Sequence, residues 1–231
     1  MTIDHSNDMY NSVKHLPFAD GKFTATPKYP HQFENFKLSK TDQPVTLLNI
    51  HNTEIDQLPI NLLKVLQDEF NYIIEEGKTY PHESSMNDIN EFKLYWFKHF
   101  ASILLQGTFT NMKDLQDDVN FNFKDIFLGT FYIKPNYIGR CSHVCNAGFI
   151  VNHEKRRLGL GKELGKKYLQ IAPKLGYIYS VLNLVFETNI ASLKIWDSLG
   201  FERIGYIKNV AVLKGNDDKL VGAYMFGKDL Q

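Results

Sequence analysis

The stretch Gly148-Phe-Ile-Val-Asn-His-Glu-Lys-Arg-Arg-Leu-Gly-Leu-Gly-Lys-Glu-Leu-Gly165 decides the fold of this chain. Its pattern predicts a strand, a turn rich in basic residues, and a helix that begins at paired glycines. Gly159 and Gly161 allow the backbone to approach an anion closely, and a helix N-terminus offers unpaired N–H groups and the positive end of the helix dipole. Full positive charges come from Lys155, Arg156, Arg157 and Lys162. The stretch therefore predicts an anion-binding turn.

Two common phosphate-binding loops do not fit this turn. A P-loop ending at Gly161-Lys162 would need glycine in place of Arg156 and Ser or Thr in place of Glu163. A dinucleotide-binding fingerprint beginning at Gly159 would need glycine in place of Leu164. A helix N-terminus with basic surface residues and no ligand remains an alternative at this point.

Composition places the chain among ordinary globular proteins. It has 231 residues, of which 43% are hydrophobic and 23% charged, and Lys plus Arg (26) balance Asp plus Glu (26). This length suits one sizeable domain. A net charge of zero provides no field to hold nucleic acid or an anionic membrane, so we expect neither as a partner.

Targeting signals are not expected in this sequence. The polar start lacks the apolar region of a secretory signal, and the longest apolar stretch, residues 176–186, is about half the length of a membrane span and contains Ser180 and Asn183. Cys141 and Cys145 lie too close together in an extended segment for an unstrained disulfide. We therefore expect a reducing compartment, cytoplasmic or nuclear.

Hydrophobic periodicity predicts a single mixed α/β domain over residues 41–231, preceded by a flexible N-terminal arm over residues 1–40. Helices in the first half and βαβ alternation in the second indicate a mixed sheet with helices on both faces. The polar stretch 108–122 is expected to be a surface loop. Helices are predicted over 59–76, 85–100, 159–171 and 190–199, and strands over 45–50, 102–105, 126–133, 146–151, 177–186, 203–208 and 221–226.

Two blocks of the sequence together resemble the GCN5-related N-acetyltransferase (GNAT) superfamily. Arg156-x-x-Gly159-x-Gly161 after a strand looks like its coenzyme A pyrophosphate loop, and Asn189-Ile-Ala-Ser-Leu-Lys-Ile-Trp-Asp-Ser-Leu-Gly-Phe201 resembles its later Asn, helix, Leu-Gly-Phe motif. Within the superfamily the chain is most similar to the fungal acetyltransferases that detoxify azetidine-2-carboxylate, a proline analogue. That resemblance is carried by Gly77-Lys-Thr-Tyr-Pro81, Leu128-Gly-Thr-Phe-Tyr-Ile-Lys-Pro-Asn-Tyr137, Arg140-Cys-Ser-His143, Cys145-Asn-Ala-Gly-Phe149, Asn183-Leu-Val-Phe186, Thr188-Asn189 and Lys194-Ile-Trp-Asp197.

The resemblance implies a GNAT-like, splayed central sheet and transfer of an acetyl group from acetyl-CoA to the nitrogen of a small imino acid, without a metal, in a homodimer. It assigns substrate binding to Asn146, to the backbone at Asn183 and Leu184, and to Tyr80. The N–H of Phe149 is expected near the thioester, and Asn189 near the coenzyme sulfur. The residues that it implies for coenzyme binding are Phe149, Ile150, Val151, Arg156, Arg157, Leu158, Gly159, Leu160, Gly161, Lys162 and Asn189.

One departure from the superfamily bears on mechanism. Many members have a Tyr four residues before the Gly of the Gly-Phe pair as general acid for the thiolate, and this chain has Trp196 there. Because an indole N–H is not a useful acid near neutral pH, Asn189 is our candidate for stabilising the thiolate, by about 3–4 kcal/mol if it resembles one oxyanion donor. We expect direct attack of a neutral amine through a tetrahedral intermediate. The general base stays open among Tyr80, His143, His153, Glu187 and a water.

Several alternatives are weighed against this reading. The acceptor could be a polyamine, an amino acid or a protein lysine, or the chain could bind acyl-CoA without catalysis. Cys141-x-His143-x-Cys145 resembles a metal-binding spacing, but in a strand its side chains lie roughly 6–7 Å apart in succession, too far to share one ion. Cys145 as a covalent nucleophile is unnecessary for direct transfer, and an apolar strand usually buries an inert thiol.

Two groups of aromatic residues are also open to interpretation. Residues 92–100 carry an aromatic stripe at helical spacing, which favours core packing over a stacking site. Phe131, Tyr80 and Phe149 are predicted to line the acceptor pocket, although Tyr80 could equally be a structural plug.

Overall fold

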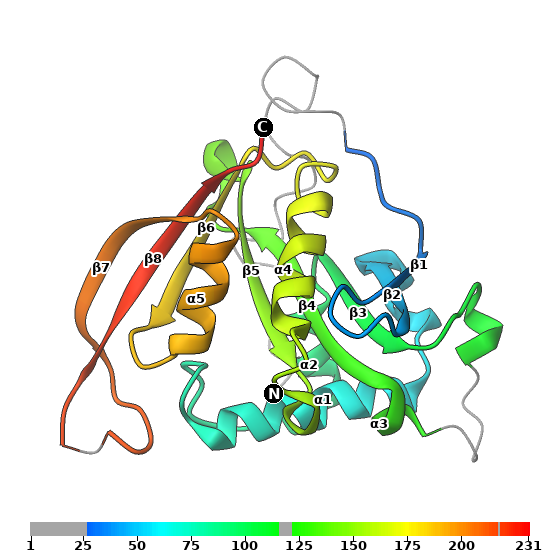
Figure 1. Cartoon of the computed structure of the whole chain (residues 1–231), viewed down its shortest axis with the longest axis horizontal. Coiled ribbons are helices and arrows are strands. Elements are labelled where there is room, and N and C mark those ends of the chain that lie inside the picture. Colours follow the sequence, from blue (N-terminus) through cyan, green and yellow to red (C-terminus); the bar gives the residue numbers. More distant parts are fainter. Residues whose placement is uncertain (1–26, 116–121, 217) are drawn as a thin grey trace.

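The computed structural model describes residues 27–115, 122–216 and 218–231, and it has one mixed sheet with helices on both faces (Figure 1). The eight strands run in the order β1-β2-β3-β4-β5-β6-β8-β7. Neighbouring strands are antiparallel except β5 and β6, which are parallel. The strands are β1 (Phe33–Lys37), β2 (Pro44–His51), β3 (Phe100–Gln106), β4 (Phe127–Pro135), β5 (Val144–Val151), β6 (Tyr179–Phe186), β7 (Glu202–Ala211) and β8 (Val221–Asp229), and the α-helices are α1 (Ile60–Glu76), α2 (Ile89–Trp96), α3 (Phe123–Ile126), α4 (Leu160–Ile171) and α5 (Ile190–Ser198).

The mixed α/β architecture predicted from the sequence is confirmed, and the βαβ half follows the prediction closely. Helix α1 ends where expected, since Gly77 takes the left-handed conformation with φ of 66° and its N–H bonds to the carbonyl of Ile73. No helix within the described ranges is both long enough and apolar enough to cross a bilayer.

The sheet begins earlier than predicted. Strand β1 lies inside the segment expected to be a flexible arm, where it pairs with β2 in antiparallel register from Phe33 to Lys37. A contact from α4 also holds it, because the ammonium of Lys167 lies 2.6 Å from the Glu34 carboxylate and 3.9 Å from the Phe36 ring centroid. The domain therefore includes residues 33–40, while residues 1–26 of the predicted arm lie outside the described residues.

Helix α2 is shorter than the predicted range 85–100. The Asp88 side chain accepts a hydrogen bond from the N–H of Asn90 at 2.8 Å and so caps the helix at Ile89. At the other end Phe100 already belongs to β3. A short helix, α3, also replaces the predicted first residue of β4, Ile126. Residues 116–121 of the predicted surface loop lie outside the described residues.

Two hydrophobic cores lie on opposite faces of the sheet. One packs α4 and α5 against the sheet around Phe131, Tyr168 and Trp196. The other packs α1 and α2 against the other face around Phe70 and Trp96. The aromatic stripe of α2 is therefore a core stripe, as its helical spacing predicts.

Strands β5 and β6 separate soon after they meet. They pair only at Val144 with Tyr179 and at Cys145 with Ser180. Beyond this point β6 carries an irregularity between Leu182 and Val185 in its pairing with β8. Such a bulge bends a strand and leaves backbone groups unpaired. The separation opens the sheet at its centre and provides the space for a cleft.

Candidate active site

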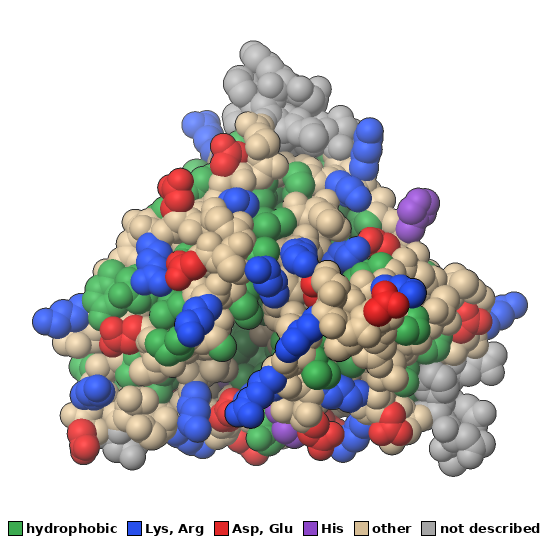
Figure 2. All heavy atoms as spheres, viewed as in Figure 1, with side chains coloured by type: hydrophobic (Ala, Val, Ile, Leu, Met, Phe, Trp, Pro, Cys, Tyr) green, Lys and Arg blue, Asp and Glu red, His purple; other side chains and the backbone are tan. Residues whose placement is uncertain are grey.

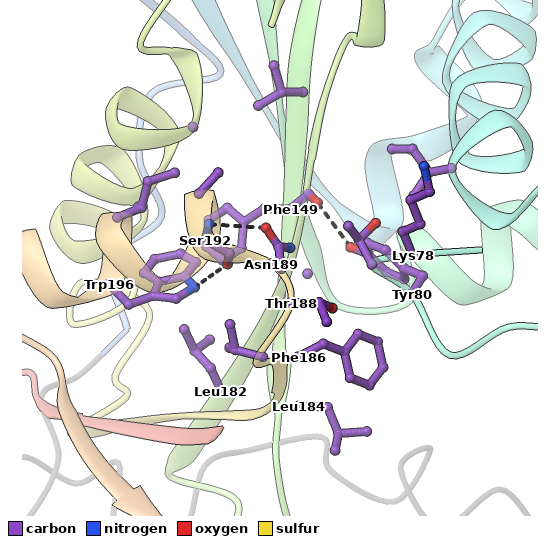
Figure 3. A pocket seen from close by; sticks show the side chains of 18 of the residues that line it. Lys78, Tyr80, Phe149, Leu182, Leu184, Phe186, Thr188, Asn189, Ser192 and Trp196 are labelled. Atoms are coloured by element: carbon purple, nitrogen blue, oxygen red, sulfur yellow. Dashed lines mark hydrogen bonds between the residues drawn. The ribbon is translucent and has the colours of Figure 1, made fainter. Parts of the chain in front are cut away.

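A cavity of about 1,100 Å³ lies where β5 and β6 separate. Figure 3 shows side chains from three directions around it: Tyr80 from the segment after α1, Phe149 from β5, and Asn189, Ser192 and Trp196 from α5. Its wall includes Lys78, Asn146, Val151, Arg156, Arg157, Gly159, Leu160, Gly161, Lys162, Asn183, Leu184, Phe186 and Lys214. Most of the predicted site residues, distant in sequence, therefore share one cavity.

The basic turn enters this cavity with a defined backbone shape. Gly159 caps α4 in the left-handed conformation with φ of 84°, and Arg157 is also left-handed with φ of 70°. Arg156 makes a two-bond pair with the Glu76 carboxylate, at 3.0 and 3.1 Å. These hydrogen bonds hold the pKa of Glu76 below its ordinary value and raise that of Arg156. Figure 2 shows basic side chains gathered around a hollow in the middle of this face.

The residues at the start of α4 fit the pyrophosphate of a coenzyme. The N–H groups of Lys162 and Glu163 bond back to the carbonyl of Gly159, which leaves those of Leu160 and Gly161 as the first-turn donors for a ligand. A Cβ on Gly161 would lie 2.9 Å from the Cδ1 atom of Ile195, so a side chain there would crowd α5. Unpaired donors and nearby cations are what a diphosphate requires.

Three residues that the sequence predicted to contribute to the coenzyme site do not line the cavity. The ammonium of Lys155 donates to the carbonyls of Lys124, Asp125 and Phe127 and so anchors the turn. Leu158 is exposed and does not line the cavity. Ile150 does not line the cavity either, because its side chain is buried in the core beneath α1.

The hydrogen-bond pattern of β5 shows which of its backbone groups face the cavity. The bonds from Asn152 N–H to Leu128 O and from Asn136 N–H to Val144 O show that even-numbered residues of β5 face β4 with their backbone groups. Odd-numbered residues face the gap toward β6. Accordingly, the carbonyl of Phe149 accepts a hydrogen bond from the Tyr80 hydroxyl at 3.2 Å (Figure 3). The N–H of Phe149 points to the same edge, because both backbone groups of an odd-numbered residue face away from β4. Phe149 thus presents a backbone donor to the cleft, and Ile150 does not.

Tyr80 is both a wall of the cavity and a structural contact. Besides its bond to Phe149, its ring packs edge-on against Phe70 at 5.2 Å. Burial raises the pKa of the Tyr80 phenol well above its ordinary value. Tyr80 therefore stays protonated near neutral pH and is not available as a general base.

The remaining side-chain candidates for the general base, and one predicted pocket residue, lie outside the cavity. His153 is held by the Glu69 carboxylate at 2.9 Å, and Glu187 accepts from the N–H of Gly222 at 2.8 Å. Neither of them lines the cavity, and His143 does not. The Phe131 side chain is fully buried in the core between β4 and the helices α4 and α5, so the expectation that it lines the pocket is wrong. Among the described lining residues the only carboxylate is Glu76, which is engaged by Arg156.

Asn189 begins α5 with its amide held in a fixed orientation. Its Oδ1 atom accepts a hydrogen bond from the N–H of Ser192 at 3.2 Å, so the amide caps the helix. The indole N–H of Trp196 donates to the Ser192 hydroxyl oxygen at 2.9 Å (Figure 3). The Nδ2 group of Asn189 and the O–H of Ser192 consequently remain as donors at the cavity wall. The sequence analysis singled out Asn189 but not Ser192, and both line the cavity.

An asparagine cluster lies at the other end of the cavity. Asn146 and Asn183, both predicted substrate residues, bond to the same side chain, that of Asn136. Leu184 follows on the bulge of β6 and lines the cavity. Sequence reasoning did not single out Asn136, because nothing in the local pattern distinguishes it from a strand-end loop residue.

The cysteines take no part in this arrangement. Cys145 is fully buried, and burial raises the pKa of its thiol to about 12. Its sulfur lies 3.1 Å from the hydroxyl of Tyr168 on the face of the sheet away from Asn146. A thiol in this state is a packing group rather than a nucleophile. Within the described ranges no cluster of three or more His, Cys, Asp or Glu residues has a geometry to hold a metal ion.

Comparison with known sequences relates this chain to acetyltransferases. Residues 112–201 match the Acetyltransferase (GNAT) family. The chain is 41% identical over 180 residues to N-acetyltransferase aca1 of Schizosaccharomyces pombe, a match that covers 77% of this chain and 82% of that protein. It is 31% identical over 207 residues to Protein SPT10 of Saccharomyces cerevisiae, covering 75% of this chain and 32% of that protein.

Solved structures show the same fold at low sequence identity. A GCN5-related N-acetyltransferase from Kribbella flavida gives a TM-score of 0.62 at 19% identity, covering 80% of this chain and 97% of that chain. The acetyltransferase yncA from Salmonella typhimurium, determined with acetyl-CoA, gives a TM-score of 0.61 at 12% identity, covering 81% of this chain and 94% of that chain.

Proposed function

This chain belongs to the GNAT family of acetyltransferases, and we propose that its acceptor is a small imino acid such as azetidine-2-carboxylate, which it acetylates on nitrogen and so detoxifies. The enzyme is an acetyl-CoA-dependent N-acetyltransferase. The observation that carries the acceptor assignment is the pair Asn146 and Asn183 at one end of the cavity, beside the aromatic wall of Tyr80, Tyr95 and Tyr132. Uncharged amides and apolar rings suit a compact zwitterion with a small ring.

The charge of the cavity wall supports this acceptor over a polyamine. A polyamine carries several positive charges and would be held by free carboxylates. Glu76 is the only carboxylate among the described lining residues, and Arg156 engages it. The remaining charged side chains in the lining are basic, so they would repel the positive charges of a polyamine.

In the proposed mechanism the neutral nitrogen of the acceptor attacks the thioester carbonyl carbon, so a C–N bond forms and the C–S bond breaks. The N–H of Phe149 donates to the carbonyl oxygen as negative charge develops there. The Nδ2 group of Asn189 and the Ser192 hydroxyl donate to the departing sulfur. Arg156, Arg157, Lys162 and the first turn of α4 hold the diphosphate of the coenzyme. The nitrogen loses its proton to water, since neither His153 nor Glu187 reaches the cavity.

We also propose that the protein works in a reducing compartment, cytoplasmic or nuclear, as a homodimer. Its two free cysteines, Cys141 and Cys145, support the first point. The dimer rests on the resemblance to the fungal enzymes, and sedimentation of the purified protein tests it.

The test is release of free coenzyme A thiol when the purified protein meets acetyl-CoA with azetidine-2-carboxylate, beside separate reactions with proline, spermidine and a lysine peptide. Release that depends on azetidine-2-carboxylate supports the imino-acid proposal. Faster release with spermidine or the peptide would overturn it in favour of that acceptor class. Coenzyme binding without release for any acceptor would indicate a binding protein.

A further inference from the structure

Asn136 occupies the junction where β4, β5 and β6 meet at the narrow end of the cleft. It follows the last residue of β4, and its backbone N–H donates to the carbonyl of Val144 at the start of β5 at 2.8 Å. Only 8% of the residue is exposed. The backbone bond and the burial hold the side chain in place beside the point where β5 and β6 separate.

The side chain of Asn136 connects the two asparagines that line the cavity. Its Oδ1 atom accepts from the Nδ2 group of Asn146 at 3.0 Å and from the Nδ2 group of Asn183 at 2.5 Å. In return, its own Nδ2 group donates to the Oδ1 atom of Asn183 at 3.2 Å. Asn136 and Asn183 therefore form a reciprocal amide pair, and Asn146 joins the same acceptor atom.

The remaining hydrogen-bonding capacity of the two lining residues can be counted. Each amide has two N–H donors and an acceptor oxygen. Asn183 uses one N–H and one lone pair of its oxygen on Asn136, so it keeps one N–H and one lone pair. Asn146 uses one N–H on Asn136, so it keeps one N–H and its whole oxygen. Two N–H donors remain for a ligand, together with both lone pairs of the Asn146 oxygen and one lone pair of the Asn183 oxygen.

We propose that Asn136 is a positioning residue that fixes the amides of Asn146 and Asn183, so that their two free N–H groups receive a carboxylate and the free Asn146 oxygen receives an N–H of the acceptor. This inference rests on the proposed function, and it narrows the ligand to a molecule with a carboxylate and an amine close together, as in an α-imino or α-amino acid. Without Asn136 both amides would rotate freely, and the match of donors and acceptor to the ligand would be lost.

A pair of acceptors that differ only in the carboxylate tests the proposal. The acceptors are azetidine-2-carboxylate and the neutral azetidine-2-carboxamide, compared by turnover, or by inhibition where turnover is absent. For Asn136→Ala we expect the KM for azetidine-2-carboxylate to rise about tenfold or more, since charge-assisted hydrogen bonds lose their geometry. The KM for acetyl-CoA should stay within about twofold, because the coenzyme contacts lie at the other end of the cleft.

The isosteric Asn136→Asp variant covers the case in which Asn136→Ala does not fold. It keeps the size and the acceptor oxygen but adds a negative charge near the bound carboxylate. Its KM for azetidine-2-carboxylate should therefore rise more than that for the carboxamide. The matched control is Asn49→Ala, since Asn49 is also buried and bonds to His31 O and Ser102 Oγ outside the cavity. We expect Asn49→Ala to lower stability without changing the ratio of the two KM values.

The outcomes separate this inference from the proposed function. Wild-type protein that acetylates neither azetidine-2-carboxylate nor any other imino acid would overturn the proposed function. Wild-type activity combined with equal effects of the Asn136 substitutions on both acceptors would overturn the positioning role alone, because a merely structural residue changes both acceptors alike.

Discussion

Asn189 has two separable tasks, and replacing it by Asp or by Ala distinguishes them. Its Oδ1 atom caps α5 through the N–H of Ser192, and its Nδ2 group is proposed to donate to the leaving sulfur. Asp retains an oxygen that caps a helix as well as Asn does, but it has no N–H to donate. Ala removes both the cap and the donor.

The structure gives a magnitude for each variant. Loss of a cap costs about 1 kcal/mol, which in a chain of this size lowers the melting temperature by roughly 2–4 °C. Asn189→Ala should therefore melt lower than wild type, and Asn189→Asp should not. Loss of one preorganised donor to a developing negative charge lowers kcat by about 10²–10³. Both variants should show at least this loss, and Asn189→Asp a larger one because its negative charge repels the departing thiolate, with the KM for the acceptor little changed.

Thermal unfolding followed by circular dichroism measures the cap, and initial rates of thiol release at saturating acetyl-CoA measure the donor. A wild-type kcat in Asn189→Asp would refute the donor role, because that variant keeps the cap. A wild-type melting temperature in Asn189→Ala would refute the capping argument. A large fall in kcat together with unchanged stability in Asn189→Asp is the outcome that the geometry predicts.

Three further predictions concern other parts of the site. Because burial raises the pKa of Tyr80 well above its ordinary value, no titration of Tyr80 should enter the pH profile. We expect kcat/KM to rise about tenfold per pH unit from about pH 6 to about pH 9, as the acceptor nitrogen loses its proton. A plateau near pH 7 that Tyr80→Phe abolishes would contradict this. Cys145, whose pKa of about 12 keeps the thiol protonated, is not a nucleophile. Cys145→Ala should keep kcat within about twofold, and mass spectrometry that detects an acetylated Cys145 during turnover would oppose direct transfer. A Cβ on Gly165 would lie 2.5 Å from Leu199 Cδ1 and 3.3 Å from Trp196 Cζ3. Gly165→Ala should therefore lower the free energy of unfolding, measured in urea, by about 1–3 kcal/mol. A variant as stable as wild type would mean that α5 adjusts at no cost.

Sequence patterns predicted those parts of the fold that local chemistry determines. The end of α1 follows from Gly77, and the start of α4 follows from Gly159, because each needs a left-handed backbone that glycine adopts freely. The sequence did not predict β1, because its five residues show only a weak alternation of hydrophobic and polar side chains. The strand is stabilised instead by pairing with β2 and by Lys167 on α4. Helix α2 is shorter than its hydrophobic periodicity predicts, because the cap at Asp88 makes the helix begin at Ile89.

The same contrast between local and distant information applies to the site. The run Phe149, Ile150 and Val151 was predicted as one coenzyme-binding segment, yet adjacent residues of a strand direct their backbone groups to opposite edges. Pairing with β4 decides which edge each residue faces, and it turns Phe149 toward the cleft and Ile150 away from it. The contacts of Asn136 depend even more on distant parts of the chain, because its partners Asn146 and Asn183 come from two other strands. Its position becomes informative only when β4, β5 and β6 are brought together, so a residue that holds two cavity-lining amides cannot be recognised from its neighbours in the sequence.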